Sequence, residues 1–63
     1  MLVTEFIGEQ FDAKVFNPKG GTVHTVRIDD AWNGEHSTKT FRGKNSRTRA
    51  IEYARKVTGY EAD

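Results

Sequence analysis

The sequence contains no cysteine, only one proline and no long apolar run. Without cysteine the chain cannot form disulfide bonds or thiolate metal sites, so its stability must come from one compact core or from association with a partner. A membrane-spanning helix needs about 20 predominantly apolar residues, and no segment approaches that length. The start of the chain also lacks the basic and apolar stretches of a secretion signal. We therefore expect a cytoplasmic protein that does not enter a membrane.

Motifs for catalysis and metal binding are missing as well. The two histidines, His24 and His36, would need carboxylates arranged by the fold to hold a metal, and we expect both to lie at the surface or on an edge strand. Gly20-Gly21 lacks the lysine and hydroxyl of a phosphate-binding loop and is better explained as turn chemistry. A chain this short also has little room for a deep pocket. We expect no catalytic residue, metal or cofactor, and hence no enzyme.

The chain has 63 residues, of which 35% are hydrophobic and 30% are charged. This length predicts one small domain over residues 1–63, close to the lower limit for independent folding. Seven aromatic residues (four Phe, two Tyr and one Trp) can still build a small core.

Alternating apolar and polar residues predict strands in the first two thirds of the chain. Residues 11–16 alternate, residues 17–21 combine proline with two glycines in a turn, and residues 22–28 are rich in β-branched side chains. Asn33-Gly34 marks a second turn before a short strand over residues 36–41, and we expect Trp32 beside it to cap one end of the core. Residues 2–7 form either the first half of a long strand bent at Gly8 or a separate edge strand.

The hydrophobic period changes after Gly43. Ala50, Ile51, Ala54 and Val57 share one helical stripe, which predicts a helix over residues 46–58. Asn45 or Ser46 is expected to cap its start, and Gly59 to end it in a left-handed conformation. Tyr53 and Tyr60 are expected at the edge of the core.

These elements predict an α+β fold, in which a three-stranded antiparallel sheet, with residues 2–7 as a candidate fourth strand, packs on one C-terminal helix. Period two divides the sheet residues between two faces. The face toward the helix should carry Phe11, Ala13, Val15, Val26, Ile28 and Phe41. The uncovered face should carry Lys14, Phe16, Val23, Thr25, Arg27, Thr38, Thr40 and Arg42.

Charge is distributed unevenly along the chain, although the net charge is only +1. Residues 39–56 hold seven cations and one acid, a balance of +6, whereas residues 1–38 have a balance of −3. Arg42, Lys44, Arg47 and Arg49 surround the expected helix start, where the helix dipole favours acids. These four cations either pair with Asp29, Asp30 or Glu35 across the fold or await an external anion.

The segment FRGKNSRTRAIEYARKV, residues 41–57, resembles the last strand and helix of the sheet-type DNA-binding domains of phage and transposon integrases and plant AP2 factors. In that family three antiparallel strands enter the major groove and a C-terminal helix packs behind them. The resemblance covers about residues 11–58 and rests on element order and this one phrase. It implies contacts to DNA from Lys14, Arg27, Thr38, Thr40 and Arg42.

Charge segregation thus predicts a small nucleic-acid-binding domain, with duplex DNA as the favoured ligand. Its expected contact residues are Lys14, Arg27, Lys39, Arg42, Lys44, Arg47 and Arg49. Two alternatives remain open. One is a small regulatory protein, of the phage or plasmid type, that docks onto a larger host protein. The other is a homodimer formed through an unpaired sheet edge.

Overall fold

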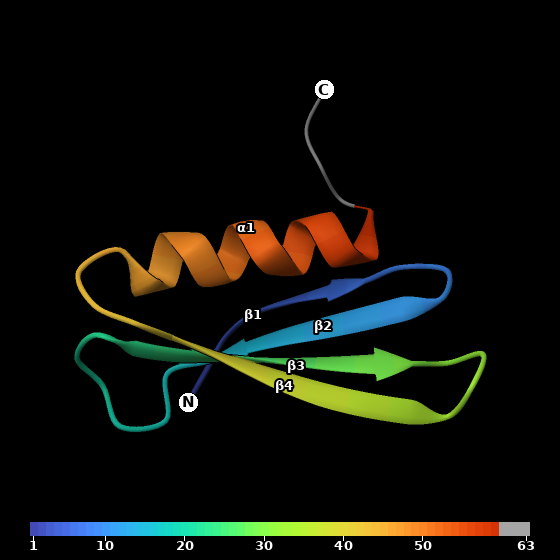
Figure 1. The fold of residues 1–63 in the computed structure, drawn as a ribbon, viewed down its shortest axis with the longest axis horizontal. Coiled ribbons are helices and arrows are strands. Elements are labelled where there is room, and N and C mark those ends of the chain that lie inside the picture. Colours follow the sequence, from blue (N-terminus) through green and yellow to red (C-terminus); the bar gives the residue numbers. More distant parts are fainter. Residues whose placement is uncertain (60–63) are drawn as a thin grey trace.

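The computed structural model describes residues 1–59, which form one antiparallel sheet and one helix (Figure 1). The strands are β1 (Leu2–Ile7), β2 (Phe11–Phe16), β3 (Val23–Asp30) and β4 (Glu35–Arg42), and the helix is α1 (Ser46–Thr58). The sheet order is β1-β2-β3-β4, so each strand pairs with its neighbour in sequence. The predicted α+β class is confirmed, and residues 2–7 form a separate edge strand.

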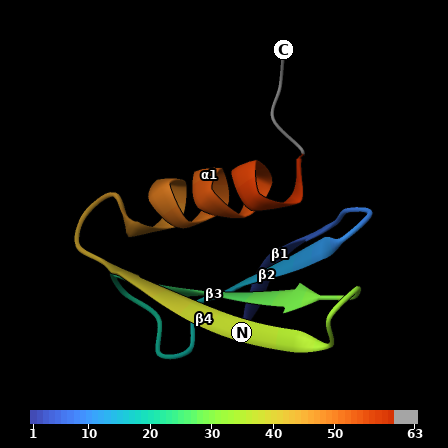
Figure 2. The same ribbon diagram turned by 45° about the vertical axis from the view of Figure 1, so that its right-hand side comes forward.

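The helix packs on one face of the sheet and leaves the other uncovered, as Figure 2 shows. Its contacts lie mainly with β2 and β3, the two central strands. Ala50 and Ala54 are fully buried at this interface, and their small side chains let the helix approach the sheet closely. No helix within residues 1–59 is long and apolar enough to cross a bilayer.

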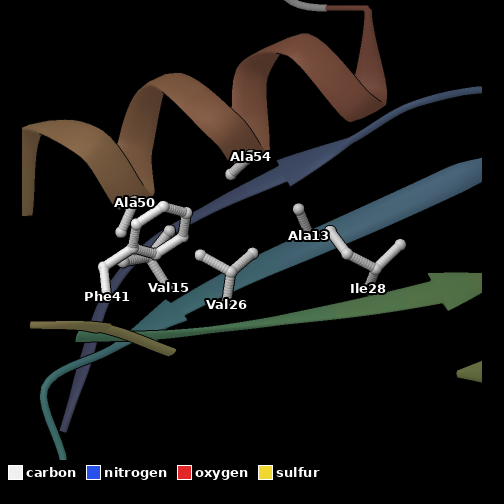
Figure 3. Packing of buried hydrophobic residues seen from close by; sticks show 7 residues of the cluster. All are labelled: Ala13, Val15, Val26, Ile28, Phe41, Ala50 and Ala54. Atoms are coloured by element: carbon white, nitrogen blue, oxygen red, sulfur yellow. The ribbon is translucent and has the colours of Figure 1, made fainter. Parts of the chain in front are cut away.

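The core lies between α1 and the sheet, where period two directs alternate strand residues toward the helix. Buried apolar residues come from three strands and the helix: Ala13, Val15, Val26, Ile28, Phe41, Ala50 and Ala54 (Figure 3). Phe11, Ile51, Tyr53 and Val57 are partly buried against them. The predicted inward set is confirmed, as is the position of Tyr53 at the core edge, whereas Tyr60 lies outside the described residues.

Gly8 forms the tight turn between β1 and β2, and its N–H donates to the Phe11 carbonyl at 3.0 Å. A β-carbon at this position would lie 2.6 Å from the Thr58 carbonyl oxygen and 2.8 Å from that of Phe11. The end of α1 therefore approaches this turn too closely for any side chain. At the same helix end, Gly59 adopts the expected left-handed conformation with φ of 83°.

Trp32 does not cap the core, contrary to the expectation from its position beside the turn. Its side chain is 70% exposed. The turn between β3 and β4 extends beyond the end of α1 (Figure 1). There the Asp30 carboxylate accepts hydrogen bonds from the Trp32 and Asn33 backbone N–H groups at 3.0 and 3.2 Å. Polar contacts thus hold the turn where the helix offers no apolar cover.

Candidate nucleic-acid interface

Three segments without an acidic residue lie at one end of the molecule, because the antiparallel strands return the chain there (Figure 1). The turn between β2 and β3, the loop from β4 to α1 and the start of β1 all lie there. The Met1 carbonyl accepts a hydrogen bond from the Asn17 N–H at 2.8 Å, and the Met1 ammonium lies 3.3 Å from the Asn17 carbonyl oxygen. Arg47 in the first turn of α1 lines an open groove of about 460 Å³ together with Met1, Leu2, Asn17 and Pro18.

We call this region the basic end. It comprises Lys19, Arg42, Lys44, Arg47 and Arg49, which lie on these segments and on the first turn of α1. Residues 1–3, 17–24 and 41–49, which form it, include no Asp or Glu. The N-terminus of α1 adds the positive end of the helix dipole to the same region.

The opposite end of the sheet collects carboxylates, and we call it the acidic end. It contains Glu9, Asp12, Asp29, Asp30 and Glu35. Strand direction explains the separation, because β2 and β4 begin, and β3 ends, at this end of the sheet. Along the sheet, the uneven charge of the sequence therefore becomes an end-to-end polarity, while Arg55 and Lys56 in the last turn of α1 lie toward the acidic end.

Four cations of the basic end have no carboxylate partner among residues 1–59. Arg42, Lys44, Arg47 and Arg49 form no ion pair there. The carboxylates proposed as their internal partners lie at the acidic end, where Asp29 pairs with Arg27 at 3.3 Å and Asp30 binds its own turn. The structure thus excludes pairing of these cations with Asp29, Asp30 or Glu35.

The remaining predicted contact residues have other neighbours. Lys14 and Arg27 lie in the middle of the uncovered sheet face, and Lys14 pairs with Glu5 at 3.9 Å. Lys39 lies on the helix side of β4, with its ammonium nitrogen 4.8 Å from the centre of the Tyr53 ring. Arg49 stacks on Phe41 at 5.6 Å. In these cation–π contacts the charged group itself lies over the ring, which positions the charge without neutralising it.

The uncovered face is mixed in charge rather than basic. Cross-strand register places Glu5, Lys14, Arg27 and Thr38 in one row. The neighbouring row, toward the acidic end, contains Ile7, Asp12, Asp29 and His36. Carboxylates therefore alternate with the cations of this face, a pattern that repels a phosphate backbone laid flat against the sheet.

The first turn of α1 is held by a buried histidine on the central strand β3, whereas the sequence predicts a histidine at the surface or on an edge strand. His24 is 4% exposed and its Nδ1 lies 2.7 Å from Oγ of Ser46, which is itself 1% exposed. The Asn17 amide nitrogen lies 3.4 Å from His24 Nε2. The ring nitrogen Nδ1 and the Ser46 hydroxyl share a hydrogen bond in which either group donates, according to the tautomer of the ring. Period two from Val26 and Ile28 was the signal that could have placed His24 inward.

No side chain caps α1, contrary to the expectation for Asn45 or Ser46. Asn45 occupies the N-cap position with φ of −105° and ψ of 19°, and its side chain makes no capping hydrogen bond. The Ser46 hydroxyl is engaged by His24 instead. The first turn also contains no acid. The positive end of the helix dipole is consequently left without a negative side chain at the basic end.

Histidine and carboxylate side chains do not gather into a metal site within residues 1–59. Among them, no cluster of three His, Asp or Glu side chains is suited to hold a metal ion. His36 and Glu35 line a small hollow of about 150 Å³ near the acidic end, with Phe11 and Ile28 forming its apolar wall. The volume is small for a ligand site, since such sites usually enclose about 300 Å³ or more.

Comparison with protein-family models, curated proteins and solved structures finds no match to this chain. The resemblance to the sheet-type DNA-binding domains therefore stays a prediction. The functional case depends on the charge geometry of the chain itself.

Proposed function

We propose that this protein binds nucleic acid through its basic end. The observation that carries the proposal is the set of cations around the helix start, Arg42, Lys44, Arg47 and Arg49, which no carboxylate within residues 1–59 neutralises. These side chains are exposed and come from the end of β4, the following loop and the first turn of α1.

A polyanion fits this arrangement better than a single small anion. The groove beside Arg47 is open rather than enclosed, and its other walls are largely apolar. Neighbouring phosphates of one backbone can engage several separated cations together, and each contact releases condensed counterions. Binding of this kind is strong at low salt and weak at high salt.

The proposal gives the uncovered sheet face a secondary role. Lys14 and Arg27 already have carboxylate partners, and Asp12 and Asp29 lie in the adjacent row. Phosphate contacts at the basic end would position the chain on duplex DNA but would carry little sequence information. We therefore expect modest sequence preference.

Fluorescence anisotropy with a short labelled DNA duplex tests the proposal. Between about 50 and 200 mM salt the affinity should fall steeply, with a log–log slope that counts the phosphates contacted. The double variant Lys44→Gln/Arg47→Gln should reduce that slope by about 2, because each lost phosphate contact contributes about 0.9.

The matched control is Lys14→Gln/Arg27→Gln, which removes the same charge from ion-paired positions on the uncovered face. It should leave the slope almost unchanged. Equal losses for the two double variants would assign binding to net charge alone, and the absence of any retained duplex at low salt would refute the proposal.

Exposed apolar side chains favour the alternative function, that of a regulator that docks onto a larger protein. Leu2, Ile7 and Trp32 are 49%, 59% and 70% exposed. Isolated surface side chains of this kind are common, so they favour the alternative less than the charge geometry favours nucleic acid. A stoichiometric protein partner whose capture survives nuclease treatment and Lys44→Gln/Arg47→Gln would establish it.

A further inference from the structure

Strand β4 forms a long and regular edge of the sheet. It spans eight residues, lies last in the sheet order and pairs with β3 without a break in register. The other edge, β1, has six residues and an irregularity between Leu2 and Thr4. Bulges and short strands are devices that keep a second chain from adding to an edge. β1 has such an irregularity and β4 has none, so the charges of Glu35, Lys39 and Arg42 are the device that β4 offers against unlike partners.

Alternate residues of β4 direct their backbone groups away from β3. The Gly43 N–H donates to the Thr22 carbonyl oxygen at 2.9 Å. Thr22 and Gly43 are therefore a hydrogen-bonded pair, and they lie next to the Val23–Arg42 pair in the ladder between β3 and β4. Antiparallel ladders alternate strictly between hydrogen-bonded and open pairs. His36, Thr38, Thr40 and Arg42 therefore present their N–H and C=O groups to the outside of the sheet.

Charge is polarised along this edge in the same sense as in the whole molecule. Glu35 begins β4 at the acidic end, and Arg42 ends it at the basic end, with Arg49 stacked on Phe41 beside it. An antiparallel neighbouring strand with the same polarity would place its acidic end beside the basic end of β4, and its basic end beside the acidic end of β4. A second copy of this chain has that polarity.

We propose that the protein forms a twofold dimer in which the β4 strands of two copies pair antiparallel and join their sheets. The register has Thr38 opposite Thr38 of the second copy. Glu35 then faces Phe41 of the second copy and lies diagonal to its Lys39. Both Lys39 and Arg49 contact the Phe41 ring, at 5.5 and 5.6 Å from its centre, so the carboxylate meets two cations.

Other registers are less favourable. Pairing centred on Lys39 would oppose two lysine side chains and bring His36 against Arg42, and like charges directly opposite destabilise a sheet. Pairing centred on Ser37 would draw the turn residues 33–34 into the ladder and align only residues 35–39 within the strands. The Thr38 register aligns residues 35–41.

The dimer goes beyond the proposed function and does not depend on it. Arg47 lies on the side of the basic end that faces β1 and the chain start, away from β4. Glu35 of the second copy would engage Arg49, and the dimer would retain Lys44 and Arg47 in two separate anion-binding surfaces, one at each end of the joined sheet.

Sedimentation equilibrium over a concentration series tests the dimer directly. The mass should rise from that of one chain to twice that value as concentration increases. Amide hydrogen exchange should show matching changes in β4, with slower exchange at residues 36, 38 and 40 in the dimer and unchanged protection at residues 37, 39 and 41. A monomer at every concentration would overturn the proposal, as would slowed exchange confined to β1.

The variant Thr38→Pro removes an outward N–H without breaking a hydrogen bond to β3, and proline is tolerated at such edge positions. It should weaken dimerisation at least about tenfold, because twofold symmetry removes two hydrogen bonds. The control Thr38→Val keeps the N–H and should still dimerise. Equal dimerisation by the proline variant would contradict pairing through β4.

Charge reversal supplies a second test that leaves the backbone intact. Glu35→Lys should weaken the dimer roughly two- to thirty-fold, because two symmetry-related attractions are lost. The double variant Glu35→Lys/Lys39→Glu should recover most of that loss. Within one chain the two residues lie four positions apart along an extended strand, too far for an ion pair, so recovery would report contact between copies. No recovery would overturn the proposed register.

Discussion

Gly8 is the residue whose identity the packing most narrowly determines. Any β-carbon there would lie under 3 Å from two backbone carbonyl oxygens, at Phe11 and Thr58. Backbone atoms cannot turn aside as a flexible side chain can. We predict that Gly8→Ala lowers the free energy of unfolding by about 1–3 kcal/mol, the usual cost of overpacking.

Urea denaturation measures the effect of Gly8→Ala, and Gly20→Asn provides the control. Gly20 has φ of 75°, but a β-carbon added there would meet no atom within 4 Å, and Asn tolerates this conformation. Its stability should change much less. A Gly8→Ala variant as stable as the parent would show that the end of α1 does not press on this turn.

Asp30 is stabilised as a carboxylate by the turn that follows it. The side-chain amide of Asn33 donates to it at 2.8 Å and is the main cause that lowers its pKa below the ordinary 3.8, aided by the Asn33 and Trp32 backbone N–H groups. A lowered folded-state pKa means that this stabilisation is present above pH 3.8 and is lost as the pH falls through the lower folded value.

We predict that Asp30→Asn removes this acid-dependent loss while keeping the shape of the side chain. Unfolding measured over a pH series should show the parent losing its advantage over the variant as the pH drops below 3.8. NMR titration of the Asp30 carboxyl carbon gives the same information directly. A midpoint at or above the ordinary value would contradict the role assigned to Asn33.

Single residues were the least predictable part of this chain. His24 follows the inward period of β3, yet a histidine is polar and its burial depends on Ser46, 22 positions away. Trp32 is large and apolar, yet it is exposed because the turn extends beyond the helix. In both cases the outcome depends on which distant element reaches the side chain, and a local pattern does not contain that information.

At the scale of elements, the start of α1 depends on the contact between Ser46 and His24. Ser46→Ala would leave a buried ring nitrogen without its partner, at a cost of about 1–3 kcal/mol in the free energy of unfolding. Thr48→Ala, in the same turn but exposed, should change stability by about 0.5 kcal/mol or less.

Chemical denaturation of the two alanine variants distinguishes the contribution of the buried hydrogen bond from a general effect of alanine in the first turn of the helix. Both substitutions raise helix propensity, so any loss specific to Ser46→Ala reflects the hydrogen bond to His24. Equal stability of the two variants would mean that the buried contact contributes nothing to the fold.

Elements themselves were largely predictable from periodicity. The helix range 46–58 and the strand over residues 11–16 match the structure. The strand expected over residues 22–28 begins one residue later and ends two residues later, and the strand expected over residues 36–41 is one residue longer at each end. The ambiguity of residues 2–7 arose because edge strand and bent strand share one pattern. The antiparallel pairing of β1 with β2, in which Phe6 lies opposite Ala13, shows that these residues form a separate edge strand.

At the scale of the whole molecule, the decisive property is where the charges lie in space. The sequence predicts an acidic first part and a basic later part, but the strands run back and forth, so each contributes to both ends. Lys19, from the acidic first part, joins the basic end, whereas Arg55 and Lys56, from the basic later part, lie at the helix end nearer the acidic end. The strand order determines at which end of the molecule each charged residue lies. Turn signals in the sequence predict that order, whereas the linear distribution of charge does not contain it.

An NMR titration of the protein with a short DNA duplex at low salt tests the central claim most directly, because it reports binding and location together. The account predicts shift changes concentrated at Lys19 and residues 42–49, with the amides of the acidic end unaffected and all changes reversed by added salt. Shift changes centred on the acidic end, or none at any position, would contradict it.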